Sequence, residues 1–272
     1  KAFKRINGLL ASLDSVQTRL ITELSLVFTD PSVQSIVGVI AQQEATHNES
    51  YSYIFSSLVE LKEQNEIYDM ARTDPSVIRR NKLIIDIYEE YRENPTPYTV
   101  AKALAASIIL EGINFYSGFA FFYHLANRQK MVGTSTMFMY IQKDEMQHGY
   151  FVAMLLRAVL TENPDIDKDG KFTKELIELF KRAAELEIEW SHEVLSEIED
   201  IDIFEMEGYI KYITNKRIGM LGIPEIYVGY DENVMPWIKA YSDESMNDTK
   251  TDFFEQKSRS YAKVDDDNGF DD

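Results

Sequence analysis

The chain has 272 residues, no cysteine and a formal net charge of −18 at pH 7. The missing cysteine excludes disulfides, zinc ribbons and thiol-based catalysis, and the strong negative charge argues against a nucleic-acid-binding surface. The sequence shows no secretory signal and no uninterrupted apolar run long enough to span a bilayer, so we expect a cytoplasmic protein that binds no membrane.

Helical periodicity dominates the chain, and glycine and proline fall mainly between the periodic segments. The tetrapeptide "TDPS" precedes two of these segments and is typical of a turn followed by a helix N-cap. No segment alternates long enough to build a sheet, so the sequence predicts an all-α fold. We expect long helices near residues 2–28, 33–63, 76–92, 97–128, 133–161 and 173–199, with shorter ones after residue 203.

The segment "QQEATHNESYSYIF" places three polar side chains on an otherwise apolar helix face. Glu44, His47 and Tyr51 are three and four residues apart, so a helix stacks them on one side. Val37 and Ile40 continue the same stripe, which should therefore face the core. A buried carboxylate is costly unless it is paired or bound to a metal.

Three other predicted helices also bring acids to their apolar faces. Asp14 lies on the stripe of the first helix, Glu111 on that of the fourth, and Glu145 with His148 on that of the fifth. Four acids and two histidines supply enough ligands for two metal ions that share bridging carboxylates. Such oxygen-rich ligation suits iron or manganese better than zinc or copper. This arrangement predicts a ferritin-like helical bundle with a dimetal-carboxylate centre in its core.

Other histidines fit this pattern less well. The segment "EWSH" repeats the Glu-x-x-His spacing with Glu189 and His192, but both lie off the apolar stripe of their helix. We expect them to belong to a solvated helix face. His124 has no acid at helical spacing, and we expect it in the core or beside the metal ligands.

The motifs together resemble the small, radical-generating subunit of class I ribonucleotide reductase. The resemblance runs from "GLLASLDSVQ" through "EATHNESYSYIF", "LEGINFYSGFAFFY" and "KDEMQHGY" to "DFFEQKSRSYAK", which is nearly the whole chain. It implies a homodimer and two metal ions, which could be two irons, two manganese ions or one of each. The resemblance implies six metal ligands: Asp14, Glu44, His47, Glu111, Glu145 and His148.

The same resemblance places a radical on Tyr51, four residues after the first ligand histidine. A phenoxyl radical persists only in a dry, unreactive enclosure, and Phe115, Phe119 and Ile141 on the facing stripes would form it. The alternative from the residues alone is an ordinary core tyrosine that donates a hydrogen bond to a ligand carboxylate.

Two further residues match the family's radical-transfer route. Asp144 corresponds to the acid that holds a ligand histidine, and Tyr261 to the interfacial tyrosine that passes the radical to the large subunit. The upstream tryptophan of this route is missing, because Trp190 and Trp237 both follow the first ligand helix; we expect it in a preceding segment.

The last residues differ in composition from the rest of the chain. We expect a ferritin-like helical domain over residues 1–241 and a flexible acidic tail over residues 242–272. The resemblance implies that this tail, with Phe270 as its anchor, docks onto the large subunit.

The resemblance implies an oxidoreductase: the small subunit of ribonucleoside-diphosphate reductase, active only with its large subunit. Its stored tyrosyl radical would be used there to reduce ribonucleotides to deoxyribonucleotides. A manganese centre would also imply an activating flavoprotein. Two alternatives remain open, namely another ferritin-like dimetal oxidase of the ligand-binding type without a stable radical, and an iron-storage protein.

Overall fold

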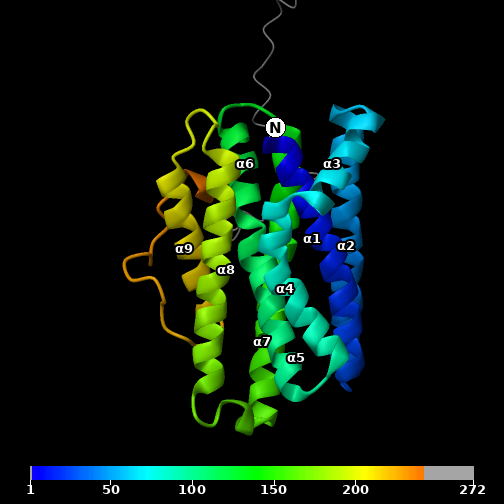
Figure 1. Ribbon diagram of the computed structural model, residues 1–272, viewed down its shortest axis with the longest axis vertical. Coiled ribbons are helices and arrows are strands. Elements are labelled where there is room, and N and C mark those ends of the chain that lie inside the picture. The colour runs from blue at the N-terminus through cyan, green and yellow to red at the C-terminus, as the bar shows by residue number, and fades with distance from the viewer. Residues whose placement is uncertain (1, 242–272) are drawn as a thin grey trace, which may run out of the picture.

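The computed structural model describes residues 2–241, and every regular element in this part of the chain is helical, which confirms the all-α prediction. Most of the long helices run along the long axis of the molecule (Figure 1). The α-helices are α1 (Ala2–Leu24), α2 (Pro31–Leu58), α3 (Leu61–Thr73), α4 (Pro75–Glu93), α5 (Pro97–Ile109), α6 (Tyr116–Asn127), α7 (Val132–Glu162), α8 (Lys171–Leu195) and α9 (Ile203–Gly219). The short helical turns are η1 (Ser25–Val27), η2 (Leu110–Asn114), η3 (Pro164–Asp167) and η4 (Pro236–Ala240).

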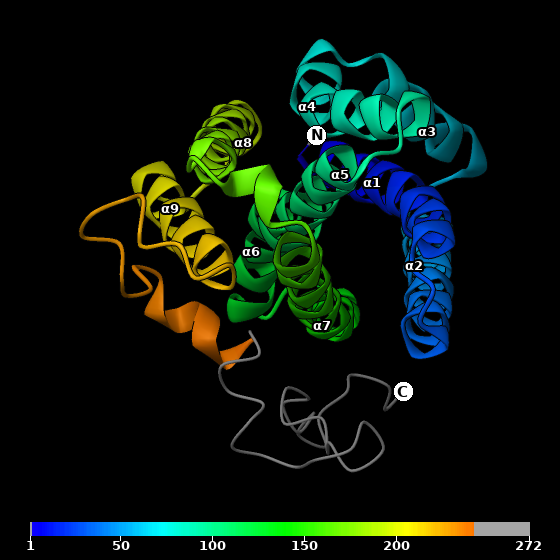
Figure 2. The ribbon, with the colours of Figure 1, turned by 90° about the horizontal axis from the view of Figure 1, so that it is seen from below.

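The helices are arranged around a central column formed by α5, η2 and α6. Helix α7 packs along this column. The pair α1 and α2 lies on one side of it, and the pair α8 and α9 lies on the other (Figure 2). Helices α3 and α4 pack against α1 and α5. The column is therefore enclosed by other helices, and any polar group that it carries inward is removed from water.

Local sequence signals explain where two of the helices begin. Asp30 accepts a hydrogen bond from the backbone N–H of Ser32 at 2.7 Å, and Asp74 accepts one from that of Ser76 at 2.9 Å. Both aspartates belong to a "TDPS" tetrapeptide whose proline occupies the first helical turn. The predicted N-caps are confirmed, and each satisfies a backbone donor that the helix itself leaves free.

The prediction of one helix over residues 33–63 was wrong at its end. Helix α2 stops at Leu58, because Val59 and Glu60 adopt extended backbone conformations before α3 begins. Neither glycine nor proline marks this break, so the sequence signal was absent. Helix α3 packs on α1, and that contact rather than local propensity accounts for the turn.

The predicted helix over residues 97–128 is interrupted in its middle. Residues Leu110–Asn114 form a π-helical turn, η2, between α5 and α6. In such a turn a backbone N–H bonds to the carbonyl group five residues earlier, whereas in an α-helix it bonds to the one four residues earlier. Turns of this kind often occur at functional sites. Glu111 lies in this turn.

The segment Pro97–Asn127 is long and apolar enough to cross a membrane by length and composition alone. All of its most apolar stretch is buried inside the protein, as in the core helix of a helical bundle. Its hydrophobicity is therefore explained by its central position in the fold.

The close approach of α1 and α3 yields a stability prediction. A Cβ atom on Gly8 would lie 3.0 Å from the Ile67 side chain and 3.1 Å from the Ile67 carbonyl oxygen. We expect Gly8→Leu to lower the free energy of unfolding by about 1–3 kcal/mol through overpacking. Urea denaturation followed by circular dichroism measures this change. Gly38→Leu is the control, because its Cβ would meet nothing within 4 Å; equal losses in both variants would contradict the packing explanation.

Candidate metal centre

The six predicted ligands come from four elements and meet in the core. Helix α1 contributes Asp14, α2 contributes Glu44 and His47, η2 contributes Glu111, and α7 contributes Glu145 and His148. The four carboxylates are fully buried, and the two histidines are at most 3% exposed. The structure thus brings together every side chain of the predicted set: Asp14, Glu44, His47, Glu111, Glu145 and His148.

The ligand atoms divide into two overlapping groups. The first group consists of Glu44, Glu111, Glu145 and His148. Each of these residues offers one ligand atom, and the four atoms lie within 4.8 Å of one another. The second group, on the same criterion, comprises Asp14, Glu44 and His47. Glu44 belongs to both groups. Glu145 also faces both histidines, with 3.0 Å between its Oε1 and His47 Nδ1 and 3.6 Å between its Oε2 and His148 Nδ1. Glu44 and Glu145 therefore lie between the two groups.

Unpartnered buried atoms indicate that the site fits a cation. Both carboxylate oxygens of Asp14 are buried, and neither forms a hydrogen bond within the described part of the chain. An ionised carboxylate in this condition is strongly unfavourable unless a metal ion or a proton compensates it. Oxygen ligands with one imidazole for each group match the preferences of iron and manganese.

Each of the two histidines makes a second polar contact through its Nε2 atom. His47 Nε2 lies 3.1 Å from Asp144 Oδ2, and His148 Nε2 lies 3.1 Å from Gln43 Oε1. The Nδ1 atoms consequently face the carboxylate cluster, and such outer contacts fix the ring orientation of metal-binding histidines. Asp144 was predicted in this place, whereas Gln43 was missed, although it directly precedes Glu44.

Glu111 is fixed by a polar chain that crosses three helices. Its Oε1 accepts a hydrogen bond from Gln17 Nε2, which also donates to Ser107 Oγ at 2.7 Å. The hydroxyl of Tyr88 in turn donates to Gln17 Oε1 at 3.1 Å. Gln17 lies on the apolar stripe of α1, one turn after Asp14, so its inward position was visible in the sequence but its partners were not.

Burial and mutual repulsion raise the pKa values of several carboxyls. Burial, followed by repulsion from Glu111, raises the pKa of Glu44 to about 7. Burial and repulsion from Glu145 raise the pKa of Glu111 to about 8, and burial with repulsion from Glu44 raises the pKa of Asp14 well above its usual range. Burial also opposes the charge of Glu145, but hydrogen bonds within the cluster outweigh this and lower its pKa.

The two histidines respond to the same negative surroundings. Burial favours their neutral form, yet hydrogen bonds from His47 to Asp144 and Glu145 raise its pKa to about 11. Contacts of His148 with Glu111 and Glu145 likewise raise its pKa far above the ordinary value. The metal-free cluster therefore holds protons where a metal ion would supply positive charge.

Tyr51 lies beside this cluster and is fully buried. Its hydroxyl lies within hydrogen-bonding reach of the Asp14 carboxylate and has no other partner among the described residues. Burial raises its pKa well above the usual value, and the charge of Asp14 contributes most among the neighbouring acids. The phenol is therefore neutral and close to the carboxylate of the α1 helix.

An aromatic cluster encloses the Tyr51 ring. Its centroid is 5.7 Å from that of Phe138, which stacks on Phe122 at 4.0 Å and lies 5.9 Å from Phe119. Phe115 stacks behind Phe119 at 5.8 Å. The predicted pocket residues Phe115, Phe119 and Ile141 are all buried. Phe138 and Phe122 were not among the predicted pocket residues.

The remaining histidines lie elsewhere. The side chains of Glu189 and His192 are 48% and 38% exposed, which confirms the predicted solvated face. His124 is buried and packs edge-on against Trp237, so it is a core residue. Tyr261 and Phe270 lie outside the described residues.

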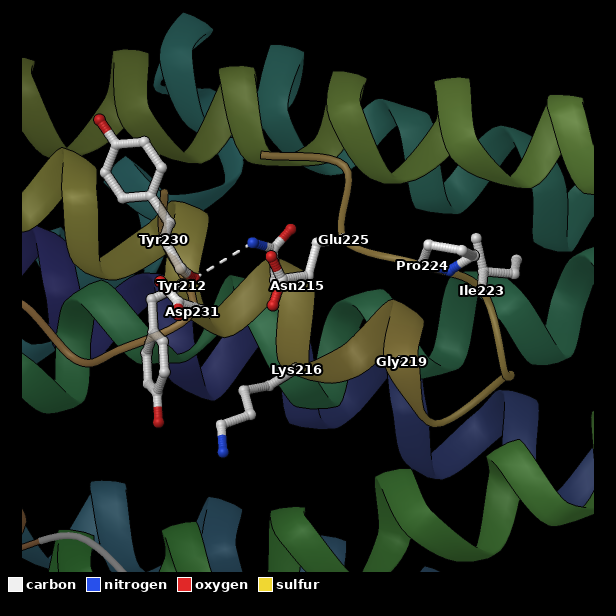
Figure 3. Close-up of a pocket in the computed structure, with 9 residues that line it drawn as sticks. All are labelled: Tyr212, Asn215, Lys216, Gly219, Ile223, Pro224, Glu225, Tyr230 and Asp231. Atoms are coloured by element: carbon white, nitrogen blue, oxygen red, sulfur yellow. Dashed lines mark hydrogen bonds between the residues drawn. The ribbon is translucent and has the colours of Figure 1, made fainter. Parts of the chain in front are cut away.

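A surface pocket of about 360 Å³ lies beside α9 and the loop that follows it. Figure 3 shows Asn215 reaching this loop, where its Nδ2 donates to the carbonyl oxygens of Tyr227 and Tyr230 at 2.8 and 3.1 Å. Its Oδ1 accepts from two backbone N–H groups of the same loop. Asn215 therefore fixes the loop, and its polar atoms are occupied.

Two sets of bridged ligands inside a helical bundle define the class of ferritin-like dimetal-carboxylate proteins. The family described as "Ribonucleotide reductase, small chain" matches residues 1–234. The chain belongs to this family, and it is accordingly an oxidoreductase subunit of the class I ribonucleotide reductase type.

Individual relatives support the same assignment. The chain is 46% identical over 272 residues to the ribonucleoside-diphosphate reductase subunit beta of Halalkalibacterium halodurans, covering 100% of this chain and 78% of the relative. A crystal structure from Bacillus halodurans, provisionally assigned to class I ribonucleotide reductase, is 42% identical with a TM-score of 0.86, covering 89% of this chain and 86% of that one. The ribonucleotide reductase R2 subunit from Clostridium botulinum is 34% identical with a TM-score of 0.84, covering 88% and 76%.

The protonated cluster predicts a pH dependence of metal binding. Metal ligands must lose their protons, and His47 and Glu111 hold theirs with pKa values of about 11 and 8. We expect Mn(II) binding to release more than one proton per chain, so the apparent affinity falls as the pH falls, by about tenfold per pH unit for each proton released. Calorimetry in buffers of different ionisation enthalpy counts the protons. A binding enthalpy independent of the buffer would contradict this.

Proposed function

We propose that this chain generates and stores a tyrosyl radical on Tyr51 and delivers it to the large subunit of a class I ribonucleotide reductase. The observation that carries the proposal is the position of Tyr51, a fully buried phenol within hydrogen-bonding reach of Asp14, beside six convergent metal ligands. The hydroxyl faces Asp14, so the phenol can give its proton to a ligand carboxylate when it is oxidised.

The metal ligands would be Asp14, Glu44 and His47 for one ion and Glu111, Glu145 and His148 for the other, with Glu44 and Glu145 bridging. When bound, the metal pair would supply the oxidising equivalent from oxygen or a related oxidant. Iron and manganese both suit these ligands. A manganese centre would need a flavoprotein as the source of its oxidant.

Tyr51 loses one electron and one proton when it becomes a neutral radical. Its raised pKa keeps the proton on the phenol until oxidation, so the proton leaves with the electron or directly after it. Asp14 is the acid whose charge acts most strongly on the phenol, and its carboxylate lies within hydrogen-bonding reach of the hydroxyl. We assign Asp14 as the proton acceptor. Phe138 and the rings behind it exclude water from the radical.

Delivery of the radical requires a route out of the core. Asp144 holds His47 and has a side chain that is 30% exposed, so it connects a metal ligand with the surface of the chain. We propose that the route continues through Tyr261 in the tail, and that residues 242–272 dock onto the large subunit through Phe270. The protein would act as a homodimer in the cytoplasm.

The radical assignment predicts the result of removing one oxygen atom. We expect Tyr51→Phe to abolish the organic radical signal in electron paramagnetic resonance after metal-free protein receives ferrous iron and oxygen. The iron content should equal that of the wild type, because Tyr51 is not a ligand. The same radical in the variant would assign it to another residue. Full iron loading without a radical in either protein, repeated with manganese and its oxidant, would favour the non-radical oxidase.

The route predicts a separation of radical storage from turnover. Asp144→Asn should keep the radical yield but lower ribonucleotide reduction with the large subunit by at least about tenfold, because His47 loses its charged partner. Asp86→Asn is the matched control, since this acid is 51% exposed and pairs only with Lys82 among the described residues. Unchanged turnover in Asp144→Asn would exclude this residue from the route.

A further inference from the structure

The π-helical turn η2 carries Glu111 into the metal cluster. The backbone of this turn is held by residues outside the cluster. All five of its residues are buried, so its carbonyl groups cannot reach water. A π-helical turn also departs from the regular four-residue hydrogen bonding of the helices on either side. What fixes this turn therefore decides where the Glu111 carboxylate lies.

Arg217 of α9 reaches the turn from outside the metal cluster. Its Nε donates to the Gly112 carbonyl oxygen at 3.2 Å, and its Nη2 donates to the hydroxyl of Tyr116. The guanidinium also lies over the Tyr116 ring, 4.9 Å from its centroid. Arg217 is buried and forms no salt bridge within residues 2–241, so its charge is balanced there by this carbonyl and this ring rather than by a carboxylate.

Gly112 leaves the room that Arg217 needs. A Cβ atom on this residue would lie 2.6 Å from Arg217 Cδ, 2.7 Å from its Nε and 2.8 Å from its Cγ. These atoms belong to the middle of a side chain that is held at its far end, so it cannot simply move aside. The residue next to Glu111 is thus a glycine because the arginine stem occupies the space of its side chain.

Arg80 of α4 holds the C-terminal end of the turn. Its Nη2 donates to the carbonyl oxygen of Asn114, and its Nε donates to Glu187 Oε2 at 2.5 Å. Glu187 also accepts a hydrogen bond from Ser117 at the start of α6. Two buried guanidinium groups from separate helices therefore bind two backbone carbonyls of the turn, those of Gly112 and Asn114, directly after Glu111.

We propose that Arg217 and Arg80 are positioning residues that hold the π-helical turn and thereby present Glu111 to the second metal ion. They touch neither the ligand side chains nor the reacting atoms. The inference rests on the proposed function, because it presupposes that the six-ligand cluster binds two ions. It predicts that loosening the turn lowers the affinity for the ion bound by Glu111. The affinity for the other ion should change less, because Asp14 and His47 belong to other helices.

The test measures Mn(II) binding to the otherwise metal-free protein, with Arg217→Lys and Gly112→Ala as variants. In Arg217→Lys the charge is kept, but the planar guanidinium group that binds both Gly112 and Tyr116 is lost. In Gly112→Ala the new methyl group displaces the aliphatic part of the Arg217 side chain. We expect the second Mn(II) ion to bind at least about tenfold more weakly in both variants. The first ion should bind within about twofold of the wild type. The exchange-coupled two-ion signal in electron paramagnetic resonance should be lost at Mn(II) concentrations that saturate the wild type.

Two matched controls separate positioning from general destabilisation. Arg5→Lys changes another buried arginine, which joins α1 to Asp74 and Glu193 and does not touch η2. Gly38→Ala adds a Cβ that meets nothing within 4 Å. Both controls should bind two ions with wild-type affinity, even where urea denaturation shows lower stability.

The outcomes separate this inference from the proposed function. A wild type that binds fewer than two Mn(II) ions overturns the dimetal centre itself. The positioning role alone is overturned if the wild type binds two ions and the variants bind them as well as the controls do. It is also overturned if the variants lose both ions equally. Selective loss of the second ion in Arg217→Lys and Gly112→Ala supports it.

Discussion

The mutual repulsion of four fully buried carboxylates is the constraint on which the rest of this structure depends. Asp14, Glu44, Glu111 and Glu145 have no solvent to stabilise their charges, and burial together with their mutual repulsion raises the pKa values of the first three. Only cations can offset this arrangement, and the metal-free chain supplies them as protons on the cluster and its histidines. A fold that tolerates such a core in its metal-free form must hold the ligands rigidly by other contacts.

Those contacts lie mostly outside the ligands. Asp144 and Gln43 fix the two imidazoles, while Gln17 fixes Glu111. Each of these links joins two different helices, so the cluster is held by the packing of α1, α2, α5 and α7 around the central column. The bundle therefore preorganises the site, so that metal binding does not have to bring the ligands together.

The sequence revealed the ligands because each one breaks an apolar stripe. Periodicity within a single helix is sufficient to detect Glu44 and His47 among valine and isoleucine, and the apolar core that surrounds them is the reason the signal is clear. Contacts between helices leave no such trace. The break between α2 and α3, the π-helical turn, Gln43 and the Phe122–Phe138 stack all depend on partners distant in the chain, and none of them follows from local spacing.

The two halves of the cluster are built differently, and this difference suits the proposed chemistry. Glu111 is fixed by Gln17, His148 and a turn whose backbone two arginines hold. Asp14 is the acid that acts most strongly on Tyr51 and lies within hydrogen-bonding reach of its hydroxyl. A proton leaving the phenol needs a nearby acceptor, and Asp14 is placed to receive it. The fixed half would hold its metal ion in place, while the half beside Tyr51 retains the freedom that proton transfer requires.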